Sequence, residues 1–120
     1  MIRNFSDLEA WQQAHQIALA VYKITQKYPR DEIFGLTSQS RRAATSIGAN
    51  IAEGFSRNTK KDKVHFYAMA RGSLTELQNH IILARDLGYA TADICSDFFK
   101  NSEWTMRLIS GLARSASDKS

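Results

Sequence analysis

Apolar residues recur every three or four positions along most of the chain, the spacing that places side chains on one face of an α-helix. The first such pattern spans residues 7–28. Ser6 or Asp7 is its expected N-cap, with Glu9 at capping-box distance from Ser6. Pro29 is expected to end the helix, because the residue before a proline avoids the helical region. The apolar row comprises Leu8, Trp11, Ala14, Ala18, Val21, Tyr22 and Thr25.

Three further rows predict three more helices, and strand-like alternation is nearly absent. The second helix is expected from residue 37 or 38 to about 55, and the third over residues 59–87 with Thr59 as its cap. Gly88 follows in the left-handed position that ends helices, and Thr91 caps a fourth helix. Short connections make sequential helices antiparallel, so we expect an all-α, up-down-up-down four-helix bundle. The three rows are Ala44, Ile47, Ile51 and Phe55; Phe66, Ala70, Ser73, Leu74, Leu77, Ile81 and Ala84; and Ile94, Phe98, Leu108, Ile109 and Leu112.

The length of 120 residues suits one domain, which we expect over residues 1–113 with a flexible tail over 114–120. Cys95 is the only cysteine, which excludes an internal disulfide and a cysteine-based zinc site. No apolar run reaches the ~18 residues of a membrane span, and the first residues lack the apolar stretch of a signal peptide. These features predict a cytoplasmic protein without a membrane partner.

Small residues are concentrated in the second predicted helix, which predicts close packing on more than one side. They are Ala43, Ala44, Gly48, Ala49, Ala52 and Gly54. Gly72 lies in the middle of the third predicted helix, where a glycine costs about 1 kcal/mol relative to alanine. We therefore expect a close helix contact there as well.

A polar stripe lies opposite the apolar row of the second helix. Glu53 and Arg57 stand four residues apart, in the order that favours an ion pair, and Arg41 points to a different side from Arg42. Either the stripe is an ordinary solvated face, or it faces another chain or a shared channel. Its members are Arg42, Ser46, Ala49, Asn50, Glu53 and Arg57.

The segment over residues 57–63 holds four basic residues and a single acid, Asp62. It is either a solvated turn or a zone of phosphate contacts next to the free amides at the start of the third helix. The formal net charge of +4 permits a nucleic-acid partner without establishing one. The basic residues are Arg57, Lys60, Lys61 and Lys63.

Catalytic groupings are weak, so we expect no enzyme, no metal site and no cofactor. His15, His65 and His80 lie on separate stretches without metal-ligand spacing. Glu53 and Glu76 could meet between the second and third helices as a carboxylate pair. Ion pairs with Arg42, Arg57 or Arg71 are the simpler account of these two acids.

Two stretches carry a family resemblance. Residues 35–54 hold the pattern Arg-Arg-Ala, Ser-Ile and Asn-Ile-Ala-Glu-Gly, followed by Arg57. Phe66 and residues 70–77 and 87–89 match a second signature. Over residues 5–89 the chain resembles the four-helix bundle proteins encoded in intervening sequences of bacterial 23S rRNA genes, and it is similar to accessory proteins of diversity-generating retroelements. It departs from the family pattern at Ser40, where a larger apolar residue is usual, and at Gln78, where Glu is often found.

The resemblance implies a left-handed bundle that assembles as a homopentamer with no established catalytic activity. The retroelement accessory proteins are basic pentamers that bind nucleic acid and a reverse transcriptase. The resemblance raises seven residues above ordinary surface positions, and the basic segment adds Lys60 and Lys61 to the candidate binding residues. The seven are Arg41, Arg42, Asn50, Glu53, Arg57, Arg71 and Glu76.

Two hypotheses about function remain open. The first is a non-enzymatic oligomer that binds nucleic acid, RNA or DNA, through its basic surface. The second is a protein-interaction scaffold whose arginines form salt bridges between subunits. Solvent-facing arginines with few carboxylate partners favour the first, and buried arginines paired with Glu53 or Glu76 favour the second.

Overall fold

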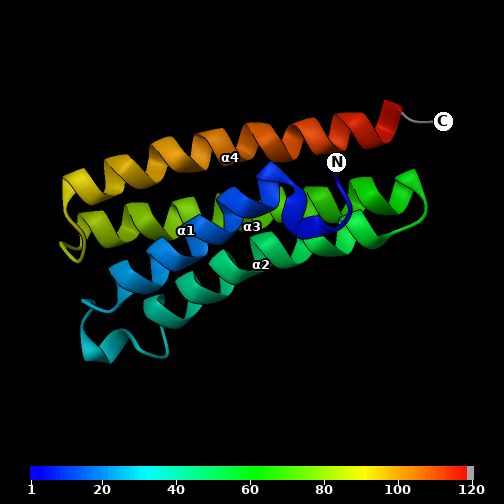
Figure 1. Cartoon of the computed structure of the whole chain (residues 1–120). Coiled ribbons are helices and arrows are strands. Elements are labelled where there is room, and N and C mark those ends of the chain that lie inside the picture. Colours follow the sequence, from blue (N-terminus) through cyan, green and yellow to red (C-terminus); the bar gives the residue numbers. More distant parts are fainter. Residues whose placement is uncertain (119–120) are drawn as a thin grey trace.

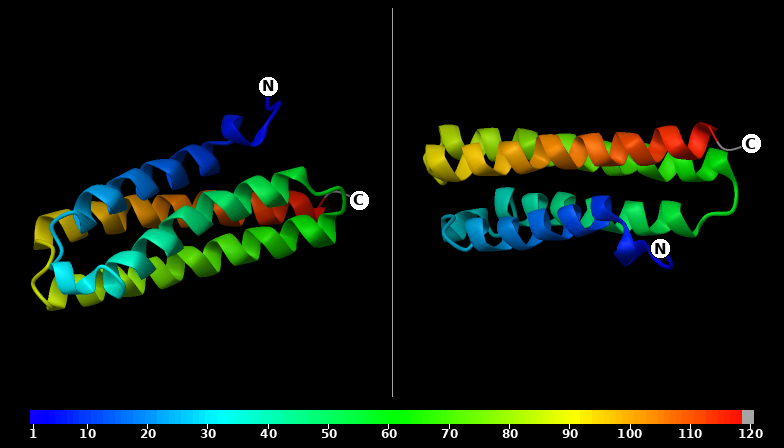
Figure 2. Two further views of the ribbon diagram at one scale, coloured as in Figure 1. Left: turned by 90° about the horizontal axis from the view of Figure 1, so that it is seen from below. Right: turned by 45° about the horizontal axis from the view of Figure 1, so that its top comes forward.

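The computed structural model of the chain describes residues 1–118 and measures 48 × 25 × 21 Å. Four α-helices form an antiparallel bundle in two layers, α1 with α2 and α3 with α4 (Figures 1 and 2). No strand occurs within the described residues, and the predicted all-α four-helix bundle is confirmed. The elements are the 3₁₀ helix Phe5–Asp7, α1 (Glu9–Thr25), the 3₁₀ helix Arg30–Glu32, α2 (Leu36–Ser56), α3 (Lys60–Asp86) and α4 (Ala92–Asp118).

The predicted apolar rows meet in the core, with three exceptions. Phe66 and Ile94 are only half-buried and lie outside the core clusters, and α3 buries Tyr67 where Phe66 was expected. Tyr22 is 44% exposed, because its ring lies on the outer side of α1 beneath the guanidinium of Arg41. Helix α4 also buries Ser102 and Thr105, whose hydroxyls donate to carbonyls of their own helix and so enter the core with a partner. The most deeply buried apolar side chains are Val21, Ile47, Ile51, Leu74, Leu77, Ile81 and Ile109.

Most predicted helix ends are confirmed. The Thr59 hydroxyl accepts from the Asp62 amide at 3.2 Å, and the Thr91 hydroxyl accepts from the Ile94 amide at 3.2 Å. Gly88 has a φ of +81°, the left-handed conformation that favours glycine. Thr59 therefore begins α3, Gly88 follows its end, and Thr91 begins α4.

The two ends predicted for the first helix are wrong. Asn4 caps the 3₁₀ helix that precedes α1, with Asp7 completing its capping box, so Ser6 and Asp7 belong to that turn. Helix α1 begins only at Glu9, after Leu8, which makes no side-chain capping bond. At the other end α1 stops at Thr25, because the chain turns before Pro29 and buries the ring of Tyr28 against Tyr89, with ring centroids 5.5 Å apart.

Helix α2 is packed on two sides, by α1 and by α3, as its small residues predict. A Cβ atom at Gly48 would lie 3.3 Å from the indole nitrogen of Trp11 on α1. A Cβ atom at Gly54 would lie 2.7 Å from the ring of Tyr67 on α3. The contact expected at Gly72 is wrong within the chain, since a Cβ there would meet no atom of the described residues within 4 Å.

Helix α4 continues past the domain boundary predicted at residue 113. Residues 114–118 are helical, and Ala116 is only 7% exposed because it packs into the main core cluster. Residues 119 and 120 of the predicted tail lie outside the described residues. None of the helices in residues 1–118 combines the length and the apolar character needed to cross a bilayer.

Candidate nucleic-acid interface

The polar stripe of α2 lies on the outside of the chain. Arg42 is exposed, and Ser46 and Asn50 are half-buried, with the Asn50 amide donating to the Ser46 carbonyl at 2.9 Å. The predicted pair is present: Arg57 Nη2 lies 3.0 Å from Glu53 Oε2, with side chains 42% and 54% exposed. An ion pair this exposed contributes little to stability, about 0–1 kcal/mol.

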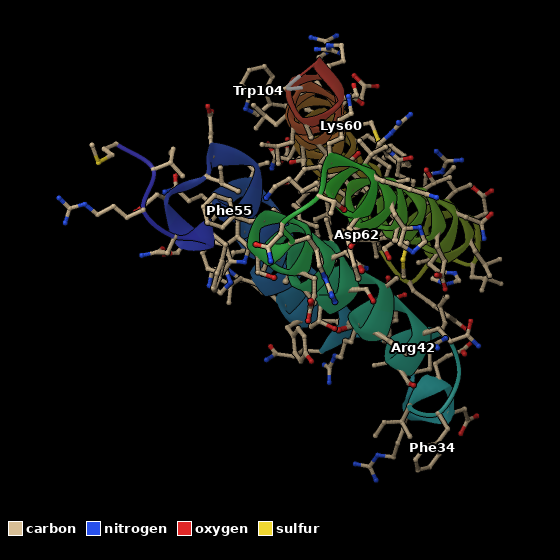
Figure 3. The ribbon with its side chains drawn as sticks, turned by 90° about the vertical axis from the view of Figure 1, so that its right-hand side faces the viewer. Phe34, Arg42, Phe55, Lys60, Asp62 and Trp104 are labelled. Atoms are coloured by element: carbon tan, nitrogen blue, oxygen red, sulfur yellow. The ribbon has the colours of Figure 1, made fainter. Side chains whose placement is uncertain are left out.

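Arg41 points away from Arg42, as the helical spacing predicts. Its Nε donates to the hydroxyl of Thr25 at 2.9 Å, and its guanidinium carbon lies 4.6 Å from the ring centroid of Tyr22. Both partners belong to α1, so Arg41 joins α2 to α1. This guanidinium is committed to the bundle, whereas Arg42 makes no ion pair within residues 1–118 (Figure 3).

Two cations of the basic segment also have structural partners. Arg57 lies over Phe66, with 4.6 Å between the guanidinium carbon and the ring centroid. The Lys63 ammonium donates to the carbonyls of Gly54 and Phe55 at 3.2 and 2.7 Å. Carbonyls in the last turn of a helix lack the usual amide donor four residues on, so Lys63 caps the end of α2, beside the Arg57 amide that donates to the Gly54 carbonyl at 3.3 Å.

The remaining cations of the set face solvent. Lys60 and Lys61 are exposed in the first turn of α3, beside the exposed Asp62, and Arg71 is exposed farther along the same helix. None of the three forms a salt bridge with another residue in the described part of the chain. Together with Arg42 they are the candidate cations whose side chains form no ion pair, hydrogen bond or cation–π contact within the described residues.

Glu53 and Glu76 do not form a carboxylate pair. Glu53 lies three residues before the end of α2 and Glu76 lies sixteen after the start of antiparallel α3. At about 1.5 Å per residue these positions are roughly 20 Å apart along the hairpin. Glu76 instead contacts His80, with 3.2 Å between Oε2 and Nε2, so its partner is a histidine of its own helix and not a predicted arginine.

The histidines are dispersed, as the sequence predicts. His15 stacks on Trp11 with ring centroids 4.9 Å apart, His65 is exposed, and His80 is only 9% exposed. Within residues 1–118 no group of three or more His, Cys, Asp or Glu side chains could hold a metal ion.

A cavity of about 690 Å³ opens beside the basic segment, and sequence reasoning missed it. The N-terminal segment, the α2–α3 connection and the C-terminal part of α4 lie at this end of the bundle (Figure 1). Three segments far apart in the sequence build its walls, so no local pattern signals it. The residues that line the cavity include Leu8, Phe55, Lys60, Tyr67, Leu112 and Ala116.

These features define a class, an all-α four-helix bundle protein with exposed cations on α2 and α3 that form no ion pair within the described residues. The model of the family described as "23S rRNA-intervening sequence protein" matches residues 6–111, so the chain belongs to that family and the predicted family is confirmed. The description of the family names no reaction.

The fold is also that of a solved structure. The chain is similar to a protein of unknown function from the S23 ribosomal protein family of Bacteroides thetaiotaomicron, with a TM-score of 0.80 and 19% identity over 88% of this chain and 95% of that one. At that identity the likeness shows the fold alone. A comparison with curated proteins finds no match.

Proposed function

We propose that this protein is a non-enzymatic oligomer that associates with structured RNA through the basic surface of its α2–α3 hairpin. The observation that carries the proposal is the exposure of Arg42, Lys60, Lys61 and Arg71 without an ion pair among residues 1–118. Cations that are not paired within the protein can neutralise phosphates and release their counterions, which drives binding. Contacts of these four cations with phosphates carry no sequence information, so RNA shape and backbone set the preference of this surface.

Oligomerisation is part of the proposal, with a homopentamer as the expected state. Large apolar side chains are exposed on α3, with Met69 44% and Leu83 47% exposed. Such side chains favour burial against a second chain. Five chains with a formal net charge of +4 each would carry about +20, and repeated phosphate contacts add.

The alternative is a protein-interaction scaffold with arginines in inter-subunit salt bridges. The pair between Glu53 and Arg57 is the observation that favours it, since the pair could rearrange to reach another chain. Arg41 already has its partners inside the chain and gives the scaffold no support. The resemblance to retroelement accessory proteins would add a reverse transcriptase as a protein partner to either hypothesis.

The test compares the salt dependence of binding in variants with matched charge. Affinity for a structured RNA is measured from about 50 to 200 mM salt for the wild type and for Arg42→Gln/Lys60→Gln/Lys61→Gln. The control variant, Lys23→Gln/Lys27→Gln/Lys100→Gln, removes the same charge from exposed positions in α1, just after it, and in α4. Light scattering verifies that the three proteins have the same mass in solution.

The proposal expects the hairpin variant to bind weakly with a shallower log–log slope, by about 0.9 for each phosphate that the variant no longer neutralises. The control should lose much less. Equal slopes in both variants would show that the hairpin does not bind the RNA. Absence of wild-type binding near physiological salt would favour the scaffold, and equal affinity for duplex DNA would remove the preference for RNA.

A further inference from the structure

The cavity at the hairpin end of the bundle has one unusual polar group in an apolar wall. Tyr67 lines the cavity and is only 3% exposed, yet its hydroxyl makes no hydrogen bond within residues 1–118. Burial also raises the pKa of Tyr67, so the hydroxyl keeps its proton and remains a donor. The hydroxyl is not among the fully enclosed unpaired atoms, so it is open to water or to a ligand in the cavity, and a ligand that displaces the water must replace its hydrogen bond.

This hydroxyl differs from two others in the core. The hydroxyls of Tyr28 and Ser40 are also unpaired, but they are fully enclosed by protein atoms. The hydroxyl of Tyr67 is not enclosed in this way, and the open space that Tyr67 borders is the cavity. A molecule in the cavity can therefore satisfy it.

The mouth of the cavity is cationic. Lys60 and Lys63 are the charged residues among those that line it, and no carboxylate of the described residues lines it. Lys63 is engaged with the end of α2, but Lys60 is exposed and forms no salt bridge within residues 1–118 (Figure 3). Asp62 is close in sequence but does not line the cavity. The mouth therefore favours an anion.

The walls of the cavity are mainly apolar, so they favour an apolar or aromatic part of a ligand. Leu8, Phe55 and Leu112 offer apolar surface, and a volume of about 690 Å³ falls in the range of small-molecule sites. A fatty acid with its carboxylate on Lys60 would place methylene groups against the hydroxyl of Tyr67 and leave that hydroxyl unpaired. A nucleobase has apolar faces and a polar edge, and its attached phosphate is anionic.

We propose that this cavity binds a single unpaired nucleotide of an RNA strand, with the base between the apolar walls, its edge on the Tyr67 hydroxyl and its phosphate on Lys60. The inference rests on the proposed function and names the part of the RNA that this end of the hairpin recognises. An unpaired base loses little stacking energy when it leaves the RNA strand, so loops, bulges and strand ends are the expected targets.

The experiment compares two RNA hairpins that differ only in a short unpaired 3′ extension. Tyr67→Phe removes the hydroxyl with little change in volume, and Ser115→Trp fills the mouth from an exposed position that lines the cavity. Tyr22→Phe is the matched control, because it removes the hydroxyl of a tyrosine that does not line the cavity. Thermal unfolding verifies that each variant is folded.

The wild type should bind the extended hairpin about three- to tenfold more tightly than the blunt one, the range expected for one hydrogen bond and the burial that accompanies it. Tyr67→Phe and Ser115→Trp should abolish that ratio and leave binding of the blunt hairpin unchanged. Tyr22→Phe should keep the ratio. A wild-type ratio of one, or a ratio that survives in both cavity variants, overturns the inference while the proposed function stands.

If neither hairpin binds, the proposed function fails, and nuclear magnetic resonance decides about the cavity. Adenosine and uridine 5′-monophosphate, added at millimolar concentration, should shift the amide signals of Leu8, Tyr67 and Leu112. An absence of shifts, or shifts caused by laurate and by neither nucleotide, overturns the inference.

Discussion

Replacing glycine with alanine at two positions should have opposite effects on stability. At Gly54 the new Cβ would lie 2.7 and 2.9 Å from two ring atoms of Tyr67 and 3.2 Å from the Cβ of Phe66. Tyr67 is 3% exposed and cannot swing into solvent, so α2 and α3 must move apart. At Gly72 the new Cβ would meet nothing within 4 Å among the described residues.

The magnitudes follow from two opposing effects. Overpacking a core contact costs about 1–3 kcal/mol. Alanine recovers about 1 kcal/mol of helix propensity relative to glycine. Gly54→Ala should therefore be about 1 kcal/mol less stable than the wild type, and Gly72→Ala about 1 kcal/mol more stable.

Urea unfolding followed by circular dichroism measures both changes at a single protein concentration, because the stability of an oligomer depends on concentration. Stabilisation by Gly54→Ala would show that the helices are not held at the distance described. Loss of stability in Gly72→Ala, together with a smaller mass by light scattering, would place Gly72 at a contact between chains.

Three further predictions concern contacts within the bundle. Lys63→Met removes the donor to the Gly54 and Phe55 carbonyls and should cost about 2 kcal/mol in urea unfolding; an unchanged midpoint would contradict the capping role. Arg41→Met loses the bond to Thr25 and should cost about 1 kcal/mol, and a neutral result would show that this bond does not join α1 to α2. Burial raises the pKa of Tyr28 to about 12 in the folded protein, above the value of 10.0 for a free tyrosine. The folded state therefore holds the phenol proton more tightly than the unfolded state, and the stability that this difference supplies is complete below pH 10 and is lost as the pH rises towards 12. Tyr28→Phe should lose less stability than the wild type over that window, and an identical alkaline loss would rule out Tyr28 as its cause.

The fold could be predicted from the sequence because the apolar rows and caps act locally. Thr59, Gly88 and Thr91 fix helix ends through bonds or backbone angles within a few residues of themselves. Ser102 and Thr105 escaped prediction because their hydroxyls find partners on their own helix, which permits burial despite polarity.

The candidate site was only partly predictable, because the role of a cation depends on distant partners. Helical spacing alone separates Arg41 from Arg42 and pairs Glu53 with Arg57. Nothing in the spacing shows that Lys63 caps α2, since that interaction depends on how the hairpin closes. The cavity around Tyr67 needs segments that lie more than 100 residues apart, from Ile2 to Ala116.

The most direct test of the central claim locates the RNA on the protein. Ultraviolet cross-linking of a structured RNA at physiological salt, followed by mass spectrometry, identifies the peptides that touch the RNA. The account predicts cross-links in the α2–α3 hairpin, at peptides that carry Phe55, Phe66 or Tyr67 beside Lys60 and Lys61. Cross-links confined to the opposite end of the bundle, or none at all, would contradict it.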